Sequence, residues 1–242
     1  MSSPVRRLFS WIGRLFTGSL GSKKSKIRLL AVGLENSRKF GACPGAGLDA
    51  QRIHDKVQAG KKILLQSSQA TKSAVTSALK EGVNGTSDDG LFIFYYSGHG
   101  GQVRDKNGDE EDGKDETFCL WDGELSDDAV WSVIQGAKCR VFMVTDCCNS
   151  GTNYMAAGIP FVKLSSCNPR KGLRLLHWGG CSDSTYSYGD SSGGVMTNSI
   201  LKMIGSGASY KKTFSRAVSD SKGFQVPVKF NLGFDEDVEV FK

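Results

Sequence analysis

The chain has 242 residues, of which 39% are hydrophobic and 23% are charged, so it can bury a core and is not a disordered tail. No apolar run approaches the roughly 18 residues that a membrane-spanning helix needs. The net charge of +6 comes from the N-terminus, because residues 1–28 hold seven basic residues and no acidic one. The remainder has 24 basic and 25 acidic residues, so we expect no nucleic-acid partner for the body of the protein.

Seven cysteines are too few and too irregular for a disulfide scaffold, and none form the CxxC pair of a zinc site. Their odd number fits a reducing compartment, and we expect a cytoplasmic monomer. Residues 4–20 predict a basic amphipathic helix. Such a helix can lie on a membrane surface, dock on the body or a partner, or act as a transit peptide. We therefore divide the chain into an N-terminal extension and linker over 1–26 and one domain over 27–242.

The body alternates between apolar strands and amphipathic helices. A continuous apolar run at 27–34 suits a buried parallel strand. Thr71 is the expected N-cap of the second helix and Gly82 its end. The later elements, in chain order, are a helix at 48–58, a strand at 62–66, a helix at 71–82, a strand at 90–101, a helix at 126–136, strands at 140–151 and 173–178, helices at 195–205 and 210–220, and a strand at 226–232. This order predicts an α/β fold with a mostly parallel sheet and helices on both faces.

Two of the predicted strands run into polar tips flanked by glycine, Ser97-Gly98-His99-Gly100-Gly101 and Asp146-Cys147-Cys148-Asn149-Ser150-Gly151. Ligands of open α/β sheets bind outside the carboxyl ends of the strands, so the two tips are expected to be neighbours. A histidine can act as base for a cysteine nucleophile. Either residue alone is more often a buried structural side chain, but their joint placement at two strand ends favours catalysis.

These tips resemble the metacaspases, a family of caspase-like cysteine peptidases, and weaker similarity extends over about 27–235. The resemblance implies a caspase-like fold, His99 as the catalytic base and Cys148 as the nucleophile. Strand alternation independently places Asp146 and Cys148 on one face and turns Cys147 away. The resemblance also implies that the backbone N–H groups of Gly100 and Cys148 stabilise the oxyanion.

Acidic side chains predict the specificity of the site. Asp146 lies two residues before the nucleophile and can reach the S1 pocket, where a carboxylate would bind a substrate Arg or Lys. Asp49 matches the second acidic pocket residue of the metacaspases, although alone it could equally be a charge at a helix N-terminus. Ser97 and Asp183 would complete the pocket wall.

An acidic stretch at 105–128 holds eleven carboxylates and two lysines. Such a density attracts a hard cation, or is simply a solvated acidic loop. Many metacaspases are activated by calcium, and the resemblance implies Asp115, Asp127 and Asp128 as Ca²⁺ ligands. Met155 stands where family members often have a further aspartate.

We therefore expect a cysteine endopeptidase that cleaves protein or peptide substrates after Arg or Lys, is stimulated by calcium and processes itself between residues 152 and 174. One alternative is a caspase-fold adaptor that acts by binding other proteins. A caspase that cleaves after Asp is the other alternative, but the Gln-Ala-Cys nucleophile pattern of that family is absent.

Overall fold

The computed structural model describes residues 25–104, 114–148, 171–180 and 189–242, with the backbone alone at positions 114, 147 and 148. Its elements, in chain order, are β1 (Ser25–Gly33), α1 (Ala46–Lys56), β2 (Lys61–Gln66), α2 (Lys72–Gly85), β3 (Thr86–Arg104), β4 (Lys114–Leu120), β5 (Gly123–Ser126), α3 (Asp127–Ile134), β6 (Arg140–Cys148), β7 (Arg174–Gly179), β8 (Gly189–Asp190), β9 (Gly193–Gly194), α4 (Val195–Met203), α5 (Tyr210–Asp220) and β10 (Val228–Leu232). The predicted N-terminal extension lies almost entirely outside the described residues.

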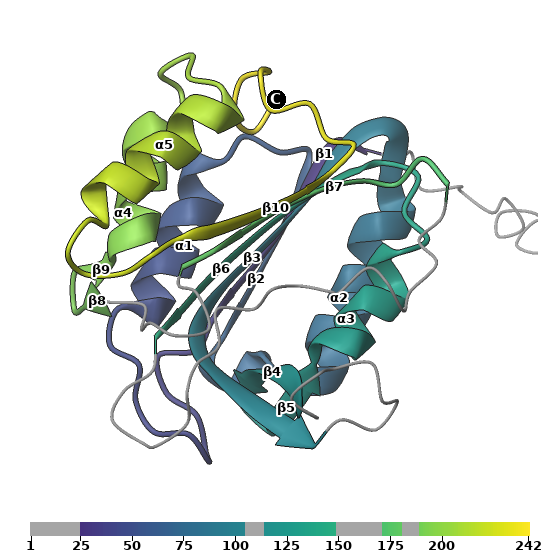
Figure 1. Ribbon diagram of the computed structural model, residues 1–242. Helices are drawn as coiled ribbons and strands as arrows, with labels where there is room; N and C mark the ends of the chain where they lie inside the picture. The colour runs from purple at the N-terminus through teal and green to yellow at the C-terminus, as the bar shows by residue number, and fades with distance from the viewer. Residues whose placement is uncertain (1–24, 105–113, 149–170, 181–188) are drawn as a thin grey trace, which may run out of the picture.

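The central sheet has the strand order β10-β7-β6-β3-β1-β2. Five of these strands are parallel, and β10 pairs antiparallel with β7 at one edge. Helices α1, α4 and α5 cover one face, and α2 and α3 cover the other (Figure 1). The prediction of a mostly parallel α/β sheet flanked on both faces is confirmed.

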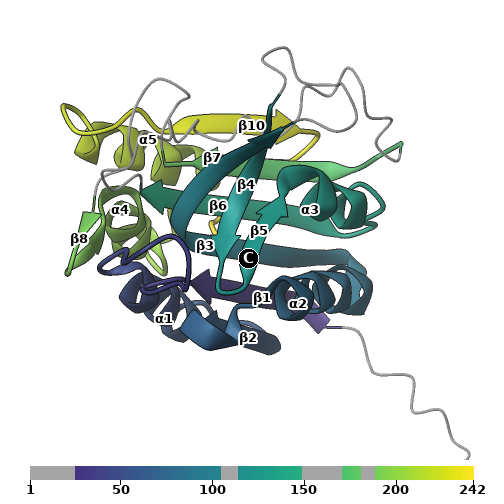
Figure 2. The same ribbon diagram turned by 90° about the horizontal axis from the view of Figure 1, so that it is seen from below.

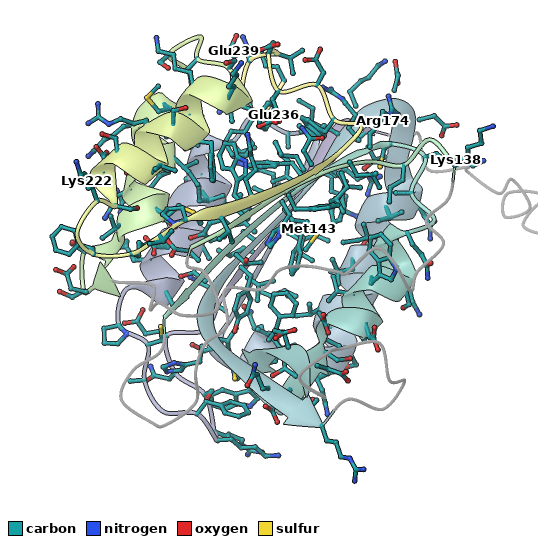
Figure 3. All side chains as sticks on the ribbon, in the orientation of Figure 1. Lys138, Met143, Arg174, Lys222, Glu236 and Glu239 are labelled. Atoms are coloured by element: carbon teal, nitrogen blue, oxygen red, sulfur yellow. The ribbon has the colours of Figure 1, made fainter. Side chains whose placement is uncertain are left out.

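Each face of the sheet contributes to its own apolar core, because side chains alternate along buried strands. On β6, Val141 and Met143 belong to the core under α2 and α3, whereas Phe142 and Val144 belong to the core under α1, α4 and α5. Figure 3 places Met143 in the middle of the sheet. The second core is rich in aromatic rings, with the Phe142 ring 4.7 Å from that of Trp178 in an edge-to-face contact.

The ends of α2 show what local signals specify. Thr71 is its N-cap, as predicted, and its hydroxyl accepts a hydrogen bond from the Ala74 N–H at 3.2 Å. The prediction that the helix ends at Gly82 is wrong, since α2 continues to Gly85. Gly82 instead allows close packing, because a Cβ there would lie 2.1 Å from the Phe92 ring.

No described helix is long and apolar enough to cross a membrane.

The structure also contains two hairpins that the sequence analysis missed. Strands β4 and β5 form an antiparallel pair that extends β3 beyond the main sheet (Figure 2). They occupy part of the stretch predicted to be an acidic loop, but Phe118 and Leu120 are buried there. Strands β8 and β9 form a short hairpin just before α4.

The two ends of the sheet differ in character. At the end where β6 and β7 begin, Figure 3 shows Lys138 and Arg174, and the Arg174 guanidinium donates to the Lys138 carbonyl at 2.8 Å. The carboxyl ends of the parallel strands lie at the opposite end, as Figure 1 shows. The predicted site residues His99 and Cys148 lie at that carboxyl end.

Candidate active site

The tips of β3 and β6 lie side by side. In the parallel pairing of these strands, Ser97 is the register partner of Asp146, and His99 is the partner of Cys148. The expectation that the two tips are neighbours is therefore met by the backbone. The strand predicted at 90–101 is confirmed and is longer than expected, because β3 runs from Thr86 through His99 to Arg104.

A change of partner explains how β3 continues. Up to His99 it pairs with β6, and from Gly100 onward it pairs antiparallel with β4. The strand curves strongly at this point (Figure 1). A Cβ at Gly98 would lie 2.7 Å from the Tyr96 hydroxyl, so the bend places backbone where a larger residue would collide. Gly100, predicted as an oxyanion donor, lies at the switch and pairs with Phe118.

His99 is held from both its ring and its backbone. Its Nε2 lies 3.0 Å from the carbonyl oxygen of Ala42, in the connection between β1 and α1. The buried Tyr96 hydroxyl donates to the His99 carbonyl at 2.7 Å and lies 3.1 Å from the Cys119 carbonyl. A carbonyl only accepts hydrogen bonds, so this contact assigns the proton of neutral His99 to Nε2 and leaves the lone pair on Nδ1.

Asp49 and Asp146 form a buried acidic pair. Asp49 lies in the first turn of α1, and the Gly194 N–H donates to its Oδ2 at 2.7 Å. The Thr197 N–H and hydroxyl, at the start of α4, donate to Asp146 Oδ2 at 3.0 and 2.7 Å. The two carboxylates are only 1% and 3% exposed. Two of the predicted S1 residues are thus brought together by α1, β6 and α4.

Burial, and after it the charge of Asp146, raise the pKa of Asp49 to about 7. The hydrogen bond from Gly194, the charge of Arg52 and the hydrogen bond from Ser97 act in the opposite direction. Ser97, the third predicted pocket residue, is therefore also part of this group. Two carboxylates so close and so buried do not both ionise readily unless a cation joins them.

A glycine turn covers the acidic pair. A Cβ on Gly193 would lie 2.1 Å from Asp49 Oδ1, and one on Gly194 would lie 2.2 Å from Asp146 Oδ2. Arg52 ties this turn to α1, since its Nη1 donates to the Ser192 carbonyl at 3.1 Å and lies 3.8 Å from Asp49 Oδ1. Neither feature was predicted, because the only signal in the sequence is a glycine pair before a helix.

The predicted calcium ligands lie beside β4. Asp115 on β4 and Asp127 at the start of α3 are buried, and Asp128 is half-buried. Carboxylates are suitable Ca²⁺ ligands, but no group of three or more His, Cys, Asp or Glu side chains within the described residues could hold a metal ion. Five further carboxylates at 105–113 lie outside the described residues, as do Asp183 and Met155. Calcium binding stays a prediction.

A second buried polar group lies on the opposite face of β6. His177 on β7 is 1% exposed, and its Nε2 lies 2.9 Å from the Thr145 hydroxyl. Burial lowers the pKa of His177 to about 3, so this ring is neutral at physiological pH. It was not predicted as a site residue.

The fold and the paired strand tips define a caspase-like α/β protein. The structure is similar to caspase-1 of Spodoptera frugiperda, with a TM-score of 0.59 at 11% identity over 86% of this chain and 87% of that one. It is also similar to the protein GSU0716 of Geobacter sulfurreducens, with a TM-score of 0.71 at 26% identity over 90% of this chain and 98% of that one.

Sequence comparison finds similarity to one family over part of the chain. Residues 47–156 match the model of the metacaspase peptidase C14 domain. Metacaspase-3 of Arabidopsis thaliana is 37% identical over 101 residues, 38% of this chain and 26% of that protein. Metacaspase-1 of Ajellomyces capsulatus is 34% identical over 163 residues, 60% of this chain and 43% of that protein. The chain therefore spans less than half the length of these relatives. The predicted resemblance to the metacaspases is confirmed over this part of the chain.

Proposed function

We propose that this chain is a cysteine endopeptidase that hydrolyses peptide bonds after Arg or Lys with His99 and Cys148. The observation that carries the proposal is the register of β3 and β6, which pairs His99 with Cys148 at the carboxyl end of the sheet. The hydrogen bond between His99 Nε2 and Ala42 supports it, because it leaves Nδ1 as the nitrogen that can accept a proton.

The reaction follows from these groups. His99 takes the thiol proton of Cys148, and the thiolate attacks the scissile carbonyl carbon. Backbone N–H groups of Gly100 and Cys148 would stabilise the resulting oxyanion. The imidazolium of His99 then protonates the leaving amine as the C–N bond breaks, which leaves a thioester. Water hydrolyses the thioester, releases the acid product and returns the proton to Cys148.

The acidic pair supports the preference for a basic P1 residue. Asp49 and Asp146 lie beside Ser97, and Asp146 comes two residues before Cys148 on the same strand. A guanidinium or ammonium group that reached this pair would relieve the repulsion between two buried carboxylates. Gly193 and Gly194 pack directly against both carboxylates. Binding of a basic P1 side chain therefore requires this glycine turn to move, or requires the side chain to approach the carboxylates from another direction.

The test uses matched peptides with Arg, Lys, Asp or Ala at P1. We expect cleavage after Arg and Lys only, and loss of cleavage in His99→Ala. An adaptor of the same fold would cleave none of them, and a caspase-like specificity would favour Asp. Either result in well-folded protein would overturn the proposal.

Self-processing is part of the same proposal. The stretch 152–174 follows the nucleophile strand and contains Lys163, Arg170, Lys171 and Arg174. Most of it lies outside the described residues, and Arg174 begins β7. We expect wild-type protein to yield a fragment that ends after one of these residues and Cys148→Ala to stay intact. An intact wild-type chain after long incubation with cleavable peptide would contradict self-processing.

A further inference from the structure

Glu35, just after β1, organises the connection that leads to α1. Its carboxylate accepts hydrogen bonds from the Gly45 N–H at 3.3 Å and from the Gly47 N–H at 3.2 Å. Its carbonyl accepts one from the Cys43 N–H at 2.8 Å. A single residue thus joins the first and last parts of a loop that spans residues 36–45.

The same loop presents the acceptor for His99. Ala42 forms an isolated antiparallel bridge with Asn36, and its carbonyl lies 3.0 Å from His99 Nε2. The Ala42 side chain is exposed, so burial does not fix its position. The N–H of its neighbour Cys43 donates to the main-chain carbonyl of Glu35, and the Glu35 carboxylate binds two residues further on, at the Gly45 N–H.

The geometry around Glu35 leaves little room for adjustment. Gly45 adopts the left-handed conformation with φ 87°, and a Cβ on Gly47 would lie 3.1 Å from Glu35 Oε2. The left-handed conformation of Gly45 therefore sets the path of the loop, and the Glu35 carboxylate holds the end of the loop in place. Its shape determines where the Ala42 carbonyl points.

We propose that Glu35 is a positioning residue for His99, an inference that rests on the proposed Cys148–His99 chemistry. By closing the 36–45 loop, Glu35 holds the Ala42 carbonyl against His99 Nε2. The ring is then fixed through Nε2, so that Nδ1 is the nitrogen that takes the proton of the Cys148 thiol in the proposed chemistry, and the carbonyl also stabilises the imidazolium that results. The competing interpretation is that Glu35 only caps the N-terminus of α1.

The experiment measures alkylation of Cys148 by iodoacetamide as a function of pH, in a Cys147→Ala background of the full chain. An imidazolium partner lowers the pKa of a thiol below its ordinary value of about 8.5. We expect Glu35→Ala to move the alkylation midpoint upward toward that value and to lower kcat for an Arg peptide about tenfold, with little change in KM. Glu35→Gln keeps one of the two acceptors and should restore part of both effects. Asp89→Ala, which removes an exposed carboxylate paired with the exposed Lys26 on another part of the surface, should match the background protein.

The outcomes separate the two interpretations. A lower melting temperature in Glu35→Ala with an unchanged alkylation profile means capping alone and overturns the inference. If Glu35→Ala does not fold, Glu35→Asp retracts the carboxylate by one methylene and decides in its place: a shifted midpoint supports the inference and an unshifted one overturns it. An ordinary midpoint in the background protein also overturns it. If the midpoint shifts but no peptide is cleaved, the peptidase proposal fails while the role of Glu35 stands.

Discussion

Neighbouring residues of β6 belong to two different buried polar groups. Asp146 lies with Asp49 on the face covered by α1 and α4, whereas Thr145 lies against His177 on the face covered by α2 and α3. Burial acts on both groups in the same way, because it favours the neutral form. It raises the pKa of Asp49 to about 7 and lowers that of His177 to about 3.

The two groups differ in how well the surrounding protein satisfies the buried side chains. The His177 ring hydrogen-bonds a hydroxyl and has shed its charge, so it fits an apolar core as it is. The acidic pair has two carboxylates whose charges repel each other, and a glycine turn packs directly against them. Equal burial therefore does not mean equal function. A buried titratable group indicates a binding site when a ligand of opposite charge would complete it.

Substitution of the next two residues on β6 tests which face of the strand carries the chemistry. Strand alternation predicts that Cys148 continues the Asp146 face and that Cys147 continues the Thr145 face. We expect Cys148→Ala to reduce kcat/KM by about a thousandfold or more, since it removes the nucleophile, and Cys147→Ala to keep a substantial part. Equal loss in both variants, with both folded by circular dichroism, would contradict the assignment.

Substitution of the carboxylates tests the acidic side of the comparison. We expect Asp146→Ala to lower kcat/KM for an Arg peptide about a hundredfold, and Asp49→Ala to have a smaller effect, because each leaves a P1 cation with one partner fewer. Iodoacetamide should still alkylate Cys148 in both variants. Asp235→Ala, at an exposed aspartate far along the chain, is the matched control. Cleavage after Arg that survives loss of both carboxylates would show that the pocket lies elsewhere.

The pH dependence of stability should have opposite signs for the two groups. The raised pKa of Asp49 gives stability that is complete below about pH 4 and is lost as pH rises toward 7. The lowered pKa of His177 gives stability that is complete above its unfolded pKa of about 6.5 and is lost as pH falls toward 3.

Urea unfolding between pH 4.5 and 6.5 measures these slopes. Relative to wild type, Asp49→Asn should make the slope of the unfolding free energy against pH more positive. His177→Gln should make this slope more negative. Each slope should change by at most about 1.4 kcal/mol per pH unit. Thr145→Val should keep the His177 slope, because burial and not the hydrogen bond causes the shift. Identical slopes in wild type and both titrating variants would refute the opposite shifts.

The smallest expected effect concerns a third set of carboxylates, Asp115, Asp127 and Asp128. If Ca²⁺ binds there, millimolar calcium should raise peptidase activity several-fold by relieving their mutual repulsion. Asp115→Asn should weaken this response, while Asp49→Asn should leave the calcium concentration at half-effect unchanged. Activity that is the same with a chelator as with calcium would exclude this role.

The sequence analysis predicted the elements whose signal is local. The apolar run before His99 and the one before Cys148 were both identified as strands, and their adjacency followed from the parallel sheet. The β4–β5 hairpin was missed because acidic residues hide the buried Phe118 and Leu120 in the same short stretch. The roles of Ala42 and Glu35 left no pattern at all, since both depend on backbone groups brought together by the loop.

The contact between His99 and Ala42 also has a consequence for mutational scanning of position 42. The acceptor is a main-chain carbonyl, which every amino acid supplies, and the side chain at position 42 is exposed. Replacing Ala42 with other residues would leave that acceptor in place, so a scan of substitutions would score the position as tolerant. Replacing the following amide with an ester, by chemical synthesis, would weaken the carbonyl as an acceptor and also remove the Cys43 N–H that donates to Glu35, a change in the main chain that no substitution of a side chain can make.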